Sequence, residues 1–189
     1  VRLRQNWSNR LYTVGSTDYE ITGAYVDAAF FDLFDRKLLV GKKGDLLNDA
    51  NAVVLTNAIA EKLFGTTDVV GKTLEADHQK NYIITGVVED IPENSSVAYE
   101  LFFSMESLKA GYANSKYWKS LDTDWGNFNY LTYLELRSVD DVAAVTQKLT
   151  QIQQQNDPNA DLFDDKAAYY LQPITAMNLY NAAGEPRGI

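Results

Sequence analysis

The chain has 189 residues, which suits one large domain or two small lobes around a hydrophobic core. Its 17 basic and 26 acidic residues leave a net charge of −9, which argues against nucleic acid or anionic lipid as a partner. The absence of cysteine excludes thiol catalysis, cysteine-ligated zinc and disulfides. No stretch approaches the ~20 continuous apolar residues of a membrane helix, so the chain as given is expected to be soluble.

The chain starts with a basic stretch. Arg2, Arg4 and Arg10 give its first ten residues a charge of +3, and we interpret them as the solvated edge of a strand. Residues 19–26 (YEITGAYV) are rich in β-branched and aromatic residues and predict a strand. Asp27 follows as the predicted N-cap of a short helix.

A second strand and helix follow. Residues 52–56 (AVVLT) predict an apolar strand that runs into the sequence NAIAEKLF. That sequence places Ile59 and Leu63 on one helical stripe. Gly65 is predicted to end the helix, because glycine is favoured just after the last turn.

Two further strands are predicted over residues 72–76 and 81–89, with the polar sequence DHQK forming the turn between them. The second of these strands has apolar side chains on both faces: Tyr82, Ile84 and Val88 on one, Ile83 and Val87 on the other. A strand that is apolar on both faces is typical of the interior of a sheet. This strand is therefore predicted to be central.

The middle of the chain is less regular. A loop over residues 92–96 leads into a predicted strand over residues 97–104 (VAYELFFS). Residues 105–127 are rich in Gly, Asn and Ser and are expected to be irregular or partly helical. Residues 128–137 (FNYLTYLELR) alternate apolar side chains and predict a half-buried strand.

The most strongly patterned helix follows this strand. Ser138 and Asp141 match the spacing of a capping box. Apolar side chains then recur at helical intervals: Val142, Val145, Leu149 and Ile152. Residues 167–180 (AAYYLQPITAMNLY) predict a closing strand. Because several strands are joined by turns too short for a helical crossover, the sequence predicts an α+β fold with a mixed sheet.

Three patterns resemble catalytic or ligand-binding motifs but lack a required part. The Gly-Lys-Thr triplet at 71–73 has Thr66 where a phosphate-binding loop needs glycine, and a strand rather than a helix is predicted after it. Asp122 and Asp124 are too close in sequence to indicate a glycosidase pair. His78 is the only histidine, so neither a multi-histidine metal site nor a catalytic triad is indicated, and it is expected in an exposed turn.

An acidic stretch near the C-terminal end partly matches a calcium-binding loop. It carries the first three ligands of an EF-hand: Asp157, Asn159 and Asp161. Leu162 stands where the motif needs glycine, and Ala168 stands where it needs the bidentate glutamate. We interpret residues 157–165 as a solvated acidic loop and leave open whether it holds a cation.

Four aromatic residues have polar neighbours and follow no strand or helix period: Tyr112, Tyr117, Trp118 and Trp125. Exposed tyrosine and tryptophan side chains are common anchors in recognition surfaces. We therefore take these four as candidates for contact with a partner or ligand, with a small satellite core as the alternative. No catalytic, cofactor-binding or metal-binding residue is predicted.

Three stretches together resemble the periplasmic core domain of MacB/FtsX-type ABC transporter permeases: ITGAYVDAAFFDLFDRKLLVGKKGDLLNDANAVVLTNAIAEKLFG, VVGKTL and NYIITGVVEDIPENSSVAYELFFS. Their order and spacing carry the resemblance, which covers residues 19–108 and resumes at residues 169–180. The chain departs from the usual family pattern at Val70, where proline is common, and at Ala176, where aspartate is frequent.

The resemblance implies a domain inserted between the first and second of four membrane helices, on the periplasmic face of the inner membrane. It also implies two lobes. A porter-like lobe with βαβ-type units would contain residues 1–103 and 166–189, and an inserted, more variable lobe would contain residues 104–165. The family has no catalytic residue and no cofactor in this domain.

The resemblance further implies a function and partners. The domain would transmit ATP-driven conformational change to a partner or substrate outside the membrane. Its partners would be a second permease copy, a cytoplasmic ATPase subunit acting through the membrane helices, and a membrane-fusion protein or other periplasmic protein. Two alternatives are a free-standing periplasmic ligand- or peptide-binding module and a hydrolase, and the lack of a nucleophile and base pair argues against the hydrolase.

Overall fold

The structure, a computed structural model, describes residues 1–5, 10–92, 94–113, 120–125, 129–157, 169–177 and 179–180. By its internal contacts the chain divides into two compact units. The first contains residues 1–124 and 129–134, and the second contains residues 125–128 and 135–189. The predicted family lobes divide the chain at other positions, and their assignment stays a prediction.

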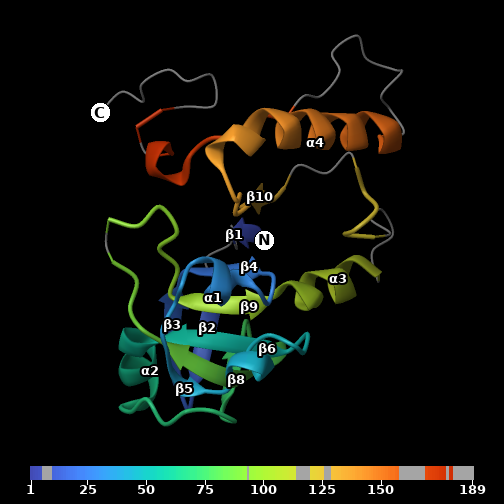
Figure 1. The fold of residues 1–189 in the computed structure, drawn as a ribbon. Helices are drawn as coiled ribbons and strands as arrows, with labels where there is room; N and C mark the ends of the chain where they lie inside the picture. Colours follow the sequence, from blue (N-terminus) through green and yellow to red (C-terminus); the bar gives the residue numbers. More distant parts are fainter. Residues whose placement is uncertain are drawn as a thin grey trace. The chain divides into compact units, whose positions relative to one another are not determined.

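The described residues of the first unit form a ten-stranded sheet (Figure 1). The strand order is β10-β1-β4-β9-β6-β8-β7-β2-β3, and β5 pairs with β8 outside this path. The strands are β1 (Arg2–Gln5), β2 (Arg10–Val14), β3 (Thr17–Ile21), β4 (Gly23–Val26), β5 (Leu38–Gly41), β6 (Ala52–Thr56), β7 (Thr73–Ala76), β8 (Lys80–Val88), β9 (Leu101–Ser104) and β10 (Leu131–Thr132). Its helices are α1 (Phe30–Leu33), η1 (Lys43–Asp45), α2 (Asn57–Phe64) and α3 (Met105–Ala113).

The sheet is mixed, which confirms the predicted fold class. Strands β4 and β9 pair in parallel, as do β6 and β8. The other pairs are antiparallel. The chain between β6 and β8 contains α2, so this part of the sheet is a parallel unit with a helical crossover.

The sheet curls on itself. Strand β3 ends the strand order, yet only Thr22 separates it from β4 near the other end. Two residue steps span at most about 7 Å, so these regions of the sheet must lie close together. Tyr12 of β2 and Phe103 of β9 meet across the curl, with ring centroids 5.7 Å apart. The prediction of one strand over residues 19–26 was wrong, because the chain turns at Thr22 from one part of the sheet to the other.

Two hydrophobic clusters lie on opposite faces of the central strands. In β6, Val53 and Leu55 belong to the cluster around Phe103, and Ala52 and Val54 belong to the cluster around α1. Neighbouring residues of a strand point to opposite faces, so β6 is buried on both sides. This is why its sequence is apolar throughout rather than alternating.

Strand β8 is central, as predicted, but its faces differ from the prediction. Val53 pairs with Ile84, whereas Val54 pairs with Gly86, so β8 holds an extra residue at this point. Beyond this bulge the side chains change faces. As a result Val87 joins Ile84 in the cluster around Phe103, Val88 faces the α1 side, and Ile83 is exposed.

Helix α2 confirms its predicted stripe and end. Ile59 and Leu63 are buried against the sheet. Gly65 has a φ of 70°, a left-handed conformation that glycine adopts without strain, and its N–H donates to the Glu61 carbonyl. The predicted irregular stretch after residue 104 begins with helix α3.

The described residues of the second unit include α4 (Val142–Asn156), η2 (Val139–Asp141) and η3 (Ile174–Ala176). Helix α4 was predicted from its apolar stripe. Ser138 accepts a hydrogen bond from the Asp140 N–H and so caps η2, but Asp141 forms no side-chain cap on α4. No helix among the residues that the structure describes is long and apolar enough to cross a membrane.

Two predicted strands were wrong for much of their length. Of the described residues 129–137, only Leu131–Thr132 forms a strand, β10, which pairs with β1. The predicted closing strand over residues 167–180 is irregular at residues 169–173 and continues into η3. Its apolar side chains do not alternate between a core and solvent: Tyr170 and Leu179 are both exposed.

Gly41→Ala is expected to destabilise the first unit by about 1–3 kcal/mol. Gly41 has a φ of 111°, and an added Cβ would lie 2.6 Å from the Thr85 carbonyl oxygen of β8. Gly44→Ala is the matched control, because nothing lies within 4 Å of its added Cβ, and it should change stability by less than about 0.5 kcal/mol. Urea unfolding followed by circular dichroism measures both. Equal effects of the two substitutions would contradict the assigned β5–β8 geometry.

Candidate functional site

The candidate site surrounds the first strand, β1. We call it the β1 junction and define it by residues 1–4, Asp27, Lys109, Asp122 and 131–133. Strand β1 lies between β4 and β10, where Leu3 pairs with Val26 on one side and Leu131 on the other. Leu3 is buried on the α1 side of the sheet. Because strand residues alternate, Arg2 and Arg4 extend from the opposite face.

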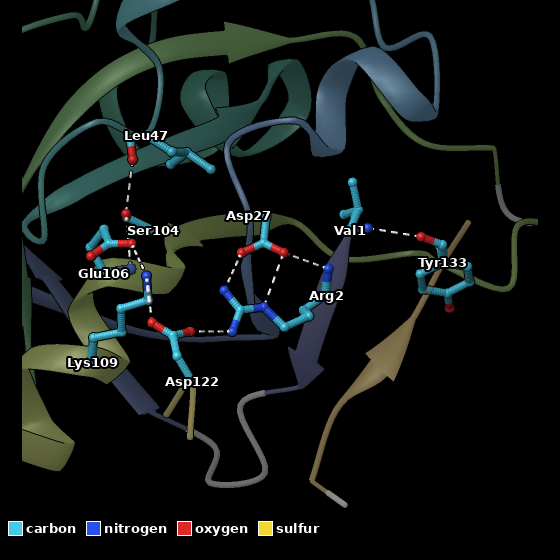
Figure 2. A network of polar contacts seen from close by, with 9 residues as sticks. All are labelled: Val1, Arg2, Asp27, Leu47, Ser104, Glu106, Lys109, Asp122 and Tyr133. Atoms are coloured by element: carbon cyan, nitrogen blue, oxygen red, sulfur yellow. Dashed lines mark hydrogen bonds and ion pairs between the residues drawn. The ribbon is translucent and has the colours of Figure 1, made fainter. Parts of the chain in front are cut away.

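Arg2 binds two carboxylates at once (Figure 2). Its Nη2 and Nε donate to the two oxygens of Asp27 at 2.9 and 3.2 Å, and its backbone N–H donates to Asp27 Oδ2 at 2.7 Å. Its Nη1 donates to Asp122 Oδ1 at 2.8 Å. One guanidinium therefore joins the residue after β4 to a segment that lies far along the chain, at Asp122.

Helix α3 extends this polar network. Lys109 Nζ lies 3.3 Å from Asp122 Oδ2 and 2.7 Å from Glu106 Oε1. The alternating charges run from Asp27 through Arg2 and Asp122 to Lys109 and Glu106, as Figure 2 shows. The network thereby connects β4, β1 and α3.

The charges of the network stabilise one another. Hydrogen bonding to Asp27 is the main reason that the pKa of Arg2 is raised. Burial alone would raise the pKa of Asp27, but its hydrogen bonds with the side chain and backbone of Arg2 lower it. The hydrogen bond from Arg2 also lowers the pKa of Asp122. All three groups are therefore ionised at neutral pH.

Near each passage of the chain between the two units, a described residue of the first unit contacts β1 or Val1. The chain leaves the first unit after Asp124, returns at Asn129 and leaves again after Leu134. Asp122 binds Arg2 just before the first passage, and Leu131 pairs with Leu3 just after the second. Before the third, the backbone of Tyr133 exchanges two hydrogen bonds with Val1, at 2.7 and 2.8 Å. Strand β1 is thus the point where these segments are fastened.

Arg4 connects β1 directly to α3. Its Nη1 donates to the Tyr112 hydroxyl at 3.0 Å, and its guanidinium carbon lies 6.0 Å from the centre of the Tyr112 ring. Tyr112 and Tyr130 both pack against the cluster around Phe103. Burial and the neighbouring Tyr112 hydroxyl raise the pKa of Tyr130. Of the predicted contact residues, Tyr112 is therefore half-buried within the first unit.

The structure describes no contact between this site and the other three predicted contact residues, Tyr117, Trp118 and Trp125. Trp125 belongs to the second unit, where its carbonyl accepts a hydrogen bond from Gln153 Nε2 at 2.7 Å. Gln153 is buried and also accepts a hydrogen bond from the Tyr169 hydroxyl at 3.0 Å. Tyr117 and Trp118 lie outside the described residues.

A small pocket of about 290 Å³ lies at the carboxyl ends of the parallel strands β4 and β9. Its lining is Asp27, Ala28, Leu47, Asn48, Ser104, Met105 and Glu106. Its two carboxylates pair with Arg2 and Lys109. Ser104 Oγ donates to the Leu47 carbonyl and accepts from the Glu106 N–H. The polar network therefore borders the pocket. Both carboxylates of the pocket, Asp27 and Glu106, already form ion pairs within the chain.

The motifs that resembled other sites occupy ordinary structural positions. Gly71 is a turn with a φ of 85°, and β7 begins at Thr73, so no helix follows as a phosphate-binding loop requires. His78 lies in the exposed turn between β7 and β8, as predicted. Residues 158–168, with most of the calcium-like loop, lie outside the described residues. Among the described residues, no group of three histidine, aspartate or glutamate side chains is placed to hold a metal ion.

Comparison with known families gives one match. The model of the MacB-like periplasmic core domain matches residues 3–152, which is most of the chain. This chain belongs to the family of MacB-like periplasmic core domains. Members of this family are periplasmic domains of ABC transporter permeases. Such a domain is part of a transporter and is not itself a catalytic domain. A search of curated proteins gave no match.

Solved structures have the same fold as this MacB-like domain. A domain assigned to a permease of Porphyromonas gingivalis matches with a TM-score of 0.67 and 24% identity, over 84% of this chain and 70% of that one. The extracellular domain of the noncanonic ABC-type transporter YknZ from Gram-positive bacteria matches with a TM-score of 0.57 and 18% identity, over 82% and 74%. The periplasmic region of MacB from Actinobacillus actinomycetemcomitans matches with a TM-score of 0.53 and 15% identity, over 82% and 68%.

Sequence reasoning missed the main interaction of the MacB-like domain. Asp27 was predicted to cap α1, but its carboxylate binds Arg2, and the N-cap position is occupied by Ala29 without a side-chain cap. Arg2 was taken as part of a solvated edge, yet its side chain is only 28% exposed. The available signal was the pattern Arg-Leu-Arg, in which a buried leucine between two arginines places both charges on one face of a strand.

Asp27→Asn is expected to lower the free energy of unfolding of the MacB-like domain by about 1–3 kcal/mol. The substitution keeps the shape of the side chain but removes the charge that faces Arg2 in a half-buried position. The matched control is Asp32→Asn, whose partner Lys43 is largely exposed, and it should cost clearly less than Asp27→Asn. Urea unfolding at neutral pH measures both. A smaller loss for Asp27→Asn than for Asp32→Asn would refute the role given to Arg2.

The stabilisation by Asp27 is expected to depend on pH. Its pKa is lowered in the folded state, so its contribution is complete above the unfolded-state pKa of ~3.9 and is lost as the pH falls through the folded-state pKa. The difference in unfolding free energy between the unmodified domain and Asp27→Asn should be constant at mildly acidic to neutral pH and shrink below pH ~4. Urea titrations across this range test it. A difference that grows on acidification would contradict the assignment.

Proposed function

We propose that this domain transmits ATP-driven conformational change from the membrane part of an ABC permease to a partner or substrate on the periplasmic face of the inner membrane. The observation that carries the proposal is that first-unit residues near all three chain passages contact β1 or Val1. In the arrangement that the family resemblance implies, β1 follows the first membrane helix. A movement of that helix would therefore reach the element that holds these passages.

The bonding of β1 suits this task. Its antiparallel hydrogen bonds to β4 and β10 run across the strand, so a displacement along β1 loads them together rather than one at a time. The Arg2–Asp27 pair adds a side-chain contact to the end of β4. Strand β4 is buried throughout its length. Movement of β1 would therefore be passed to the sheet core instead of being absorbed by local unfolding.

The proposal includes partners. ATP hydrolysis would take place on a separate cytoplasmic subunit, and a second permease copy would supply a matching periplasmic domain. A membrane-fusion protein or other periplasmic protein would receive the movement. The predicted contacts with such a partner remain Tyr112, Tyr117, Trp118 and Trp125. The predicted lobes remain residues 1–103 with 166–189 for the porter-like lobe and residues 104–165 for the variable lobe.

The transmission function is tested in the permease that contains this domain, reconstituted with its ATPase subunit. The domain has no cysteine, so Val139→Cys introduces one spin-label site in it, and Val139 is 82% exposed. Electron–electron distance measurements between the labels of two permease copies are expected to differ between ATP-free and ATP-bound states. The control is the same permease with an ATPase subunit that cannot bind ATP. Identical distances in all states would refute transmission through this domain.

A further inference from the structure

We propose that Asp122 is a releasable latch on the segment that leads out of the first unit. In the closed state it holds this segment against Arg2 and Lys109, and it opens while Arg2 stays bound to Asp27. The proposal deepens the transmission function and rests on it for its biological role. Its physical basis is the difference between the two carboxylates that share Arg2 (Figure 2).

Asp27 is the fixed side of Arg2. It receives three hydrogen bonds from that residue, two from the side chain and one from the backbone. Its side chain is 27% exposed, so water competes weakly for it. Asp27 also comes directly after β4, a strand that is buried on both faces. Opening this contact would leave a half-buried charge unpaired, which is strongly unfavourable.

Asp122 is the weakly held side. Its side chain is 52% exposed, and Arg2 reaches it through Nη1 alone, at 2.8 Å. Lys109 approaches its other oxygen at 3.3 Å but is itself held by Glu106 at 2.7 Å. Contacts of a side chain this exposed change the ratio of closed to open states by only about two- to fivefold in all. The contact therefore defines a preferred position without locking it.

Leu121 provides the pivot beside the latch. It is 7% exposed and packs in the cluster around Phe103. Asp122 is the next residue, and the first segment of the unit ends two residues later, after Asp124. Because Leu121 stays in the core, opening the latch does not detach the segment. Opening allows residues 122–124 to adopt conformations in which Asp122 does not contact Arg2 or Lys109.

The latch responds to charge rather than to protonation near neutral pH. The lowered pKa of Asp122 and the raised pKa of Lys109 keep both groups ionised there. Exposed ion pairs are screened by salt, whose Debye length falls from ~8 Å at physiological ionic strength to ~3 Å at 1 M. Salt should therefore open the latch, whereas the half-buried Asp27 contact should be much less sensitive.

Hydrogen exchange of the isolated chain tests the latch. In Asp122→Asn, amide exchange of the segment 120–124 is expected to be about two- to fivefold faster, and exchange in β4 and β9 unchanged. Asp124→Asn is the matched control, with the same change of charge two residues away, and should leave exchange in this segment unchanged. Equal exchange in Asp122→Asn and the unmodified chain would overturn the proposal.

A second measurement compares the effect of salt on exchange in the same two proteins. Raising the salt concentration to about 1 M should accelerate exchange of residues 120–124 in the unmodified chain but add nothing in Asp122→Asn. An equal salt effect in both would overturn the latch. Neither measurement uses ATP or the rest of the permease. Failure here therefore leaves the transmission proposal standing, and failure of the distance measurements leaves the latch standing as a property of the domain.

Discussion

The structure of the first unit depends on a single covalent constraint: one residue, Thr22, connects β3 at the end of the sheet with β4 near its other end. A flat sheet cannot satisfy this connection, so the strands wrap around a common interior. Phe103 lies at its centre, in ring contact with three tyrosines from three other strands: Tyr12, Tyr25 and Tyr82. Such aromatic pairs contribute about 0.5–1.5 kcal/mol each beyond the area that they bury.

The same topology explains why the polar network forms where it does. Strands β4 and β9 are parallel, so their carboxyl ends lie at one edge of the sheet. Asp27 follows β4 there and α3 follows β9, although they are far apart in sequence. Strand β1 runs antiparallel beside β4 and starts at this edge, which brings Arg2 between Asp27 and the α3 side. No local feature of these segments requires the meeting.

The sequence pattern predicted those elements whose structure depends on neighbouring residues alone. The apolar run of β6, the stripe of α2 and the glycine at its end follow from burial and backbone preference, and the structure confirms them. The faces of β8 could not be predicted, because a bulge depends on the register with β6. The role of Asp27 was missed for a similar reason. Its N-cap propensity is local, whereas Arg2, its partner, comes from a strand twenty-five positions earlier.

The short β10 strand has an evolutionary consequence. It adds two residue pairs at the outer edge of the sheet, Arg2 with Thr132 and Leu3 with Leu131, while the interior strands are buried on both faces. Because β10 belongs to the first unit, a second unit of different length or sequence would leave both backbone pairs in place. The sequence of the second unit can therefore change in evolution while the curled sheet of the first unit is kept.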